Sequence, residues 1–110
     1  MNDKLLIIIA TQDKEKALTA LAYAHNTIKY NWLSDVKVIF FGPFENLIAS
    51  DVDIAKEVTA IAQLTGTTAC KFLSDRDGIS EEIAKLGIAV DYVGTIIADH
   101  LKNGYVPMVW

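Results

Sequence analysis

Cys70 has the clearest potential for chemistry in this chain, because it is the only cysteine among 110 residues. It ends Thr67–Cys70, which has the composition of a short strand, and precedes the polar, helix-forming segment Lys71–Arg76. A thiol at such a junction meets the amide groups of a helix N-terminus, which favour the thiolate. A single cysteine excludes an internal disulfide and an all-cysteine zinc site. Cys70 is therefore either a buried apolar side chain, as free cysteines often are, or the chemical centre of the protein.

Two residues that follow Cys70 within about one helical turn are candidates to assist it. A Lys71 ammonium turned towards the sulfur would stabilise a thiolate, and a Ser74 hydroxyl would hydrogen-bond a terminal sulfur. The alternatives are a solvated surface lysine and a small helix residue without a role. The charged residues 75–77 form either a solvated turn or the border of a docking surface for a carrier protein.

Metal and nucleotide sites are not indicated by the sequence. His25 and His100 are far apart, and no carboxylate or thiol joins them at ligand spacing. Gly42–Pro43 and Gly94–Thr95 lack the spacing of a phosphate-binding glycine loop. We therefore expect neither a metal nor a cofactor.

The composition indicates one domain, residues 1–110, with an apolar core. Hydrophobic residues make up 52% of the chain and charged residues 22%, a balance unlike that of disordered chains. The net charge is −4 and the lysines form no stripe, which argues against nucleic acid or an anionic membrane as a partner. The apolar run Leu5–Ala10 is too short to span a bilayer or to form the core of a signal peptide. We therefore expect a cytoplasmic protein.

Strand-like and helix-like segments alternate along the chain. Apolar and β-branched runs predict five strands, at Leu5–Ala10, Val36–Phe41, Thr67–Cys70, Ile88–Val93 and Tyr105–Trp110. Helical spacing and capping residues predict helices from Thr11 or Asp13 to about Trp32, from Asp51 to Gly66, over Lys71–Arg76, from Ser80 to Gly87 and over Ile96–Asn103, with one helical turn at Phe44–Ile48. This alternation predicts an α/β fold, a three-layer α/β/α sandwich with a mostly parallel five-stranded sheet.

In such sheets the ligands and the chemistry gather at the carboxyl ends of the strands. The residues at these ends are Thr11, Gln12, Gly42, Pro43, Cys70, Lys71, Gly94 and Thr95. The presence of Cys70 in this set favours a functional role, with its sulfur at the rim of the sheet and within reach of a partner. Pro107 cannot donate to a ladder, so the last strand is expected at an edge.

Several short motifs occur in an order and at a spacing that are informative together. They are Phe41-Gly42-Pro43, Ala69-Cys70-Lys71, Asp91-Tyr92-Val93-Gly94 and Gly104-Tyr105-Val106-Pro107. In this arrangement, over essentially the whole chain, the sequence resembles the DsrE/DsrF-like (YchN-like) family of sulfur-relay subunits and small uncharacterised proteins. The resemblance implies an α/β/α domain that assembles into homotrimers, hexamers or related heteromers. It also implies that Cys70, the cysteine after the third strand, accepts a persulfide sulfur and passes it to the next carrier.

The chain departs from many of these relatives, which have a further cysteine where it has Phe72, Leu73 and Ser74. Transfer would therefore use one thiol and a thiol of a partner. Our leading hypothesis is a sulfur carrier or sulfurtransferase-type relay protein in which Cys70 holds a persulfide and a sulfur-carrier protein is the partner. The alternative is a non-catalytic oligomeric module that binds a small ligand or assembles with a partner protein.

The end of the sequence favours an oligomer. Tyr105–Trp110 is apolar and aromatic, and a hydrophobic strand at a sheet edge promotes association. Burial between subunits would cover it, and Trp32 and Phe44 are candidates for the same interface. The alternative is that these residues fold over the core of a single subunit. We expect a homo-oligomer, a trimer or a hexamer.

Overall fold

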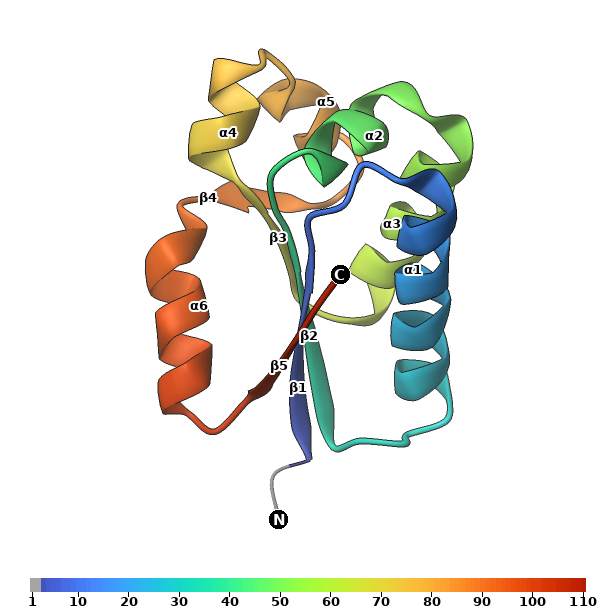
Figure 1. The fold of residues 1–110 in the computed structure, drawn as a ribbon, viewed down its shortest axis with the longest axis vertical. Coiled ribbons are helices and arrows are strands. Elements are labelled where there is room, and N and C mark those ends of the chain that lie inside the picture. The colour runs from blue at the N-terminus through green and yellow to red at the C-terminus, as the bar shows by residue number, and fades with distance from the viewer. Residues whose placement is uncertain (1–2) are drawn as a thin grey trace.

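Five parallel strands form the middle layer of the molecule (Figure 1). In the computed structural model, which describes residues 3–110, the strands are β1 (Lys4–Ile9), β2 (Asp35–Phe40), β3 (Thr67–Cys70), β4 (Ala89–Asp91) and β5 (Val106–Val109). Their order is β4-β3-β2-β1-β5, and every pairing is parallel. Leu5–Ile9 in β1 is buried throughout, as its continuous apolar run predicts. The predicted three-layer α/β/α sandwich is confirmed.

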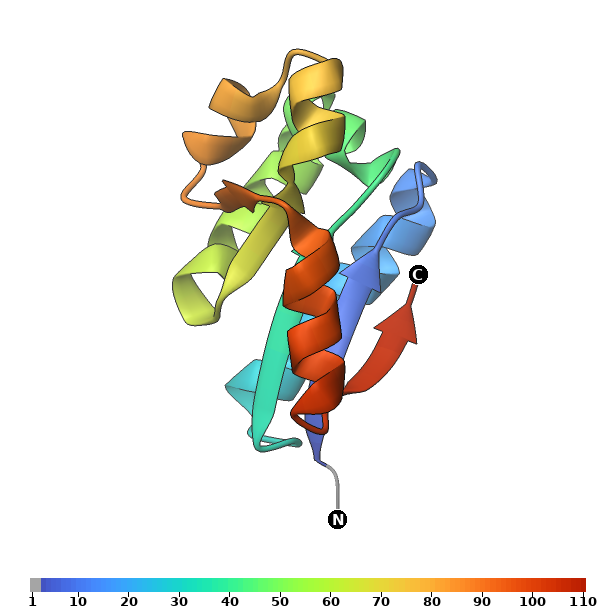
Figure 2. The same cartoon turned by 90° about the vertical axis from the view of Figure 1, so that its left-hand side faces the viewer.

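The helices occupy both faces of the sheet and one of its ends. They are α1 (Lys14–Lys29), α2 (Phe44–Ser50), α3 (Val52–Leu64), α4 (Lys71–Arg76), α5 (Ser80–Ala84) and α6 (Val93–Lys102). α1 and α3 cover one face, α6 covers the other, and α2, α4 and α5 gather beyond the carboxyl ends of the strands (Figures 1 and 2). The chain steps along the sheet from β1 to β4 and then returns to β5. Because parallel crossovers are right-handed, the returning helix α6 lies on the face opposite α1 and α3.

The sheet separates two apolar clusters of unequal size. The larger lies against α1 and α3 and includes Phe40, Phe44 and Ala69. The buried members of the smaller are Leu6, Ile8, Ile39, Cys70 and Val93. Side chains alternate between the faces of a strand, so Ala69 and Cys70 enter different clusters. Cys70 therefore belongs to the face that α6 covers.

Two of the helix boundaries that differ from the sequence-based expectation have a clear physical cause. α1 ends at Lys29 rather than near Trp32, because Tyr30 caps it and Asn31 adopts a left-handed conformation with φ 52°. α6 begins at Val93 rather than after Thr95, and β4 ends at Asp91. The buried Val93 packs into the smaller cluster as the first residue of the helix.

The last strand lies at an edge, as Pro107 predicts, but its side chains are divided between the core and the surface. Met108 and Trp110 pack against the larger cluster of the same subunit, whereas Val109 is 67% exposed. The expectation that Phe44 joins an intersubunit contact is wrong, because Phe44 is fully buried against Phe40 in the core.

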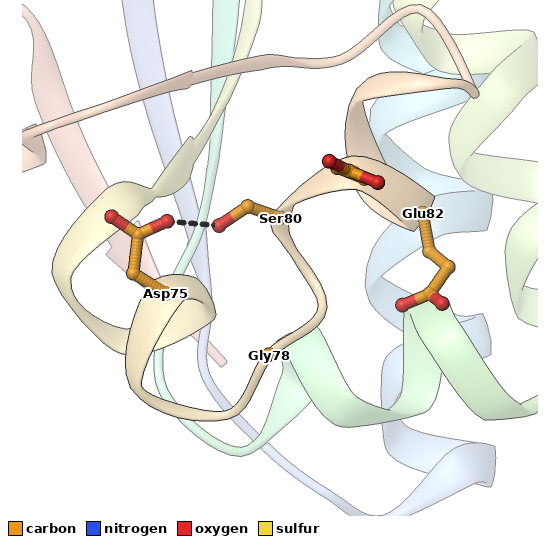
Figure 3. A pocket seen from close by; sticks show the side chains of 5 residues that line it. Asp75, Gly78, Ser80 and Glu82 are labelled. Carbon is orange, nitrogen blue, oxygen red and sulfur yellow. Dashed lines mark hydrogen bonds between the residues drawn. The ribbon is translucent and has the colours of Figure 1, made fainter.

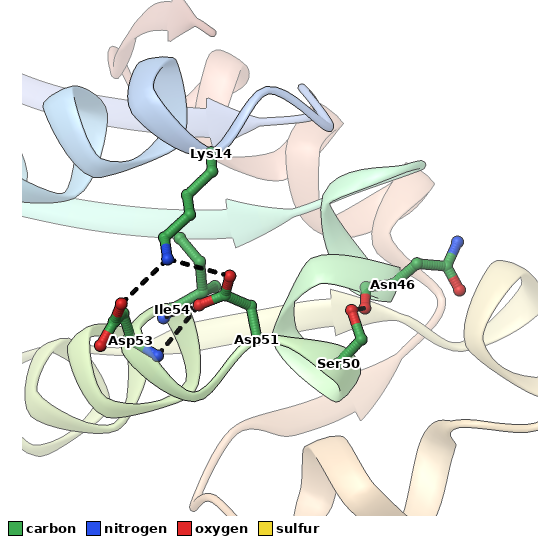
Figure 4. Close-up of polar contacts among 6 residues, drawn as sticks. All are labelled: Lys14, Asn46, Ser50, Asp51, Asp53 and Ile54. Carbon is green, nitrogen blue, oxygen red and sulfur yellow. Dashed lines mark hydrogen bonds and ion pairs between the residues drawn. The ribbon is translucent and has the colours of Figure 1, made fainter.

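Asp51 lies between α2 and α3, caps α3 and forms an ion pair with α1 (Figure 4). It is the N-cap of α3, and its carboxylate accepts hydrogen bonds from the amides of Asp53 (3.0 Å) and Ile54 (3.1 Å). The Lys14 ammonium of α1 lies 3.1 Å from Asp51 and 2.9 Å from Asp53. These bonds hold the pKa of Asp51 below its usual value, with the Ile54 amide as the largest favourable contribution.

Replacing Asp51 tests whether the cap or the ion pair stabilises this junction. Asp51→Ala loses both, and we expect the free energy of unfolding to fall by the amount usual for a lost helix cap. Asp51→Asn keeps an oxygen acceptor for the two amides and loses only the charge, so its stability should stay near wild type. Urea denaturation monitored by circular dichroism measures both. Equal destabilisation of the two variants would show that loss of the ion pair with Lys14, and not loss of the cap, lowers the stability.

Candidate functional site

Cys70 lies where the predicted strand ends, at the carboxyl edge of the sheet. It is the last residue of β3, it is in register with Asp91 of β4, and it is the N-cap residue of α4. The residue is only 6% exposed, and its side chain belongs to the smaller apolar cluster, against which Leu73 of α4 also packs. The expectation of a sulfur within direct reach of a partner is wrong for this conformation. Chemistry at Cys70 requires the covering residues to move.

Lys71, predicted as a possible aid to the thiol, pairs within its own helix. Its ammonium lies 2.7 Å from the Asp75 carboxylate, one turn along α4, and both side chains are substantially exposed. The pairing raises the pKa of Lys71 and, together with a bond from Ser80, lowers that of Asp75. Lys71 therefore adopts the solvated arrangement and supports α4.

Ser74 is buried and connects α4 to α5. Its hydroxyl lies 2.7 Å from the Ser80 hydroxyl, and Ser80 donates a hydrogen bond of 2.5 Å to Asp75 (Figure 3). Beside this network is an open pocket of about 330 Å³ lined by Asp75, Gly78, Ser80, Glu81 and Glu82. Cys70 does not line this pocket. The Ser74 hydroxyl thus has a structural partner.

The other predicted residues lie in the loops at the same edge of the sheet. The Thr11 hydroxyl accepts a hydrogen bond from the Asp13 amide, 3.1 Å away, in the turn that begins α1, and Gln12 is exposed. Gly42 has φ +62°, a conformation that favours glycine, and Pro43 precedes α2. The tight turn at Gly42 leads from β2 into α2, which lies beyond the carboxyl ends of the strands (Figure 1).

Glu45, in the first turn of α2, was not predicted and is the unusual polar group of this region. Its residue is fully buried, and neither carboxyl oxygen has a hydrogen-bond partner of normal geometry. The backbone amides of Cys70 and Gly42 face the carboxyl group without forming such bonds, and both act to lower its pKa. An acidic residue in a first helical turn is usually a solvated partner of the helix dipole, so the sequence did not distinguish Glu45. The available signal was its place between the apolar Phe44 and Leu47–Ile48 in a short helix.

Burial raises the pKa of Glu45 to about 7, against an ordinary value of 4.5. The nearby Asp77 carboxylate raises it further, whereas the Cys70 amide, the Gly42 amide and the Arg76 guanidinium oppose the shift. Burial is the largest cause because the carboxylate form loses its hydration without gaining a full set of partners. Glu45 therefore exchanges its proton near neutral pH, beside the backbone of Cys70.

Two further observations concern metal ligands and membrane-spanning helices. Across residues 3–110, no three histidine, cysteine or acidic side chains come together as a metal site would need. In the same range no helix combines the length and the apolar character that a membrane crossing demands.

Comparison with solved structures supports the fold. A conserved protein of unknown function from Bacteroides thetaiotaomicron, BT1422, is 29% identical with a TM-score of 0.92, over 99% of this chain and 96% of that one. A protein of unknown function from Methanobacterium thermoautotrophicum, MTH1491, is 16% identical with a TM-score of 0.80, over 97% and 98% of the two chains. Neither protein-family models nor curated proteins give a match. The chain thus shares its fold with these two proteins.

Glu45 makes the stability of the protein depend on pH. Between pH 4.5 and 7 the folded state holds a proton that the unfolded chain releases, so the free energy of unfolding falls as pH rises. The full shift corresponds to about 3 kcal/mol. Urea denaturation of wild type across this range should show the decrease, and Glu45→Gln should abolish it. Glu82→Gln, which removes an exposed carboxylate from α5, should retain it. A decrease of equal size in Glu45→Gln would refute the assignment.

Proposed function

We propose that the protein is a sulfur carrier of the sulfur-relay type, with Cys70 as its persulfide-bearing residue. The observation that supports this best is the place of the only cysteine, at the carboxyl end of β3 and the start of α4. Parallel α/β sheets concentrate their chemistry at this edge. The motif resemblance to the DsrE/DsrF-like family supports the same role, and a sulfur-relay protein of this kind would act in the cytoplasm.

One thiol is sufficient for the transfer if both partners supply thiols. The Cys70 thiolate attacks the outer sulfur of a donor persulfide, the donor S–S bond breaks, and the donor leaves as a thiolate. Cys70 then carries the outer sulfur with its proton. A thiolate of a sulfur-carrier protein attacks that outer sulfur in turn and releases the Cys70 thiolate. Neither step needs an oxidant or a reductant, because the sulfur is exchanged between equivalent S–S bonds.

The burial of Cys70 favours a second candidate function. A thiol that is 6% exposed and packed among apolar side chains also suits a non-catalytic module that binds a small ligand or assembles with a protein. The two candidates differ in whether Cys70 becomes accessible in the native protein. Native alkylation of Cys70 that is no faster than global unfolding allows favours the module.

Persulfide loading tests the carrier function directly. The protein is incubated with a small-molecule persulfide donor at pH 8, freed of donor and weighed intact. We expect wild type to gain the mass of one sulfur atom, and a thiol acceptor added afterwards to remove it. Cys70→Ser, which keeps the size of the side chain, should gain nothing. Equal gain by Cys70→Ser, or none by wild type, would refute the carrier.

The same proposal includes a homo-oligomer, a trimer or a hexamer. Large apolar side chains are exposed along the edge strand and on the side that α6 covers, at Val106, Val109, Leu101 and Tyr92. α6 buries only Val93 completely, so this face is thinly covered within one subunit. Association would remove these groups from water. Pro107 limits direct strand pairing at the β5 edge, so contacts between side chains are the expected mode.

Light scattering at micromolar concentration should give a mass several times that of one chain. Val109→Asp places a charge in the exposed apolar edge and should shift the protein towards a smaller species without unfolding it. The matched control is Val52→Asp, because Val52 is 83% exposed on α3, which covers the opposite face. A wild-type protein that is a monomer at this concentration would contradict the oligomer.

A further inference from the structure

The structure holds three features at one edge of the sheet whose combination suggests a control on the thiol. A buried cysteine precedes α4, a buried and unpartnered carboxyl group faces the backbone of that cysteine, and α4 is a short helix with one fully buried residue. We propose that Glu45 gates Cys70: when Glu45 loses its proton, α4 lifts from the molecule and exposes the thiol. Exposure of the thiol by this gate does not require the proposed carrier function. Only the use of the exposed thiol for sulfur transfer rests on that function.

α4 is one of two helices that contact the apolar cluster around Cys70, and α6 is the other. The first turn of α4 follows Cys70 directly, and its Leu73 packs against the apolar cluster that holds the sulfur. Ser74 is the only fully buried residue of α4, and Phe72 is 65% exposed. A six-residue helix with so little buried apolar surface has a low free energy of local opening.

Glu45 lies where α2, the end of β3 and the end of α4 approach one another. Its carboxyl group faces the Cys70 amide, and the charges of Arg76 and Asp77 at the end of α4 act on it. α2 is also tied to this end of α4 by a hydrogen bond from Asn46 to Asp77, 3.3 Å long. The other helices packed against α2 contribute exposed charges, Glu81 and Glu82 of α5 and Asp53 and Lys56 of α3.

Ionisation of Glu45 weakens this junction in two ways. The carboxylate is buried without hydrogen-bond partners, and an unpaired buried charge is strongly unfavourable. It also adds a second negative charge beside Asp77, which already occupies Arg76 in an ion pair of 3.0 Å. Lifting α4 admits water to the carboxylate and separates it from Asp77. The protonated carboxyl group has neither cost, so the closed state is preferred at acidic pH.

The size of the effect follows from the proton equilibrium. If the carboxyl group titrates near 7 when closed and near 4.5 when solvated, the open fraction rises about tenfold between pH 6 and pH 8. The rise ends above this range, because both states are then ionised.

Alkylation of Cys70 measures the open fraction, and the single cysteine makes the readout specific. Iodoacetamide labelling is followed by intact mass in the native protein and in the same protein unfolded in urea, at each pH. The ratio of the two rates gives a protection factor from which the ionisation of an ordinary thiol cancels. We expect this factor to fall about tenfold from pH 6 to pH 8 in wild type and in Glu82→Gln. In Glu45→Gln, a neutral residue of the same shape, it should change by less than about twofold.

Either of two results overturns the gate: a wild-type protection factor that does not fall with pH, or an equal fall in Glu45→Gln. If Glu45→Gln does not fold, Asp77→Asn tests the same mechanism. Removal of the like charge should move the fall in protection to lower pH, and an unchanged midpoint counts against the gate. Persulfide loading separates the two proposals. Gated alkylation without sulfur uptake removes the carrier function alone, whereas uptake with pH-independent protection removes the gate alone.

Discussion

The parallel direction of all five strands is the constraint on which the rest of the structure depends. It requires every connection to return along the sheet, so that right-handed crossovers in two directions cover both faces, and it brings every carboxyl end to one edge. α2, α4 and α5 are built into these connections beyond that edge. Residues distant in sequence, such as Glu45 and Cys70, become neighbours there for this reason alone. The candidate site is thus a consequence of topology before it is one of side-chain chemistry.

The fold was largely predictable because each strand has a local apolar signature and each helix a capping residue or an apolar stripe. Asp51 is an example, since its position before an apolar helical pattern identified the start of α3, and its side chain does cap that helix. The end of α1 was placed too late, although Asn31, which adopts φ 52° just after the helix, is a residue type that tolerates this conformation. The boundary between β4 and α6 was not predictable, because it depends on the packing of Val93 into the smaller cluster, for which the local sequence gives no signal.

The position of Cys70 was predictable from the sequence, whereas the residues that surround it were not. Strand and helix signatures place Cys70 at a junction, but they say nothing about which residues cover it. Lys71 and Ser74 follow Cys70 in sequence, yet their polar atoms bond to Asp75 and Ser80. Glu45 is 25 positions away in the numbering and reads as an ordinary first-turn acid. Its burial arises from the turn at Gly42, the apolar neighbours of α2 and the end of α4, which meet only in the folded chain.

The face on which Cys70 lies determines whether a local motion can reach it. Ala69, the preceding residue, enters the larger cluster between the sheet and α1 and α3, where exposure would require most of the core to separate. Cys70 enters the smaller cluster, which is covered by α6 and by Leu73 of α4. Displacement of a short helix can therefore uncover Cys70 while the larger cluster stays intact. A thiol one residue earlier would be accessible only through global unfolding, so the alternation of side chains along β3 is what makes a gated thiol compatible with a stable domain.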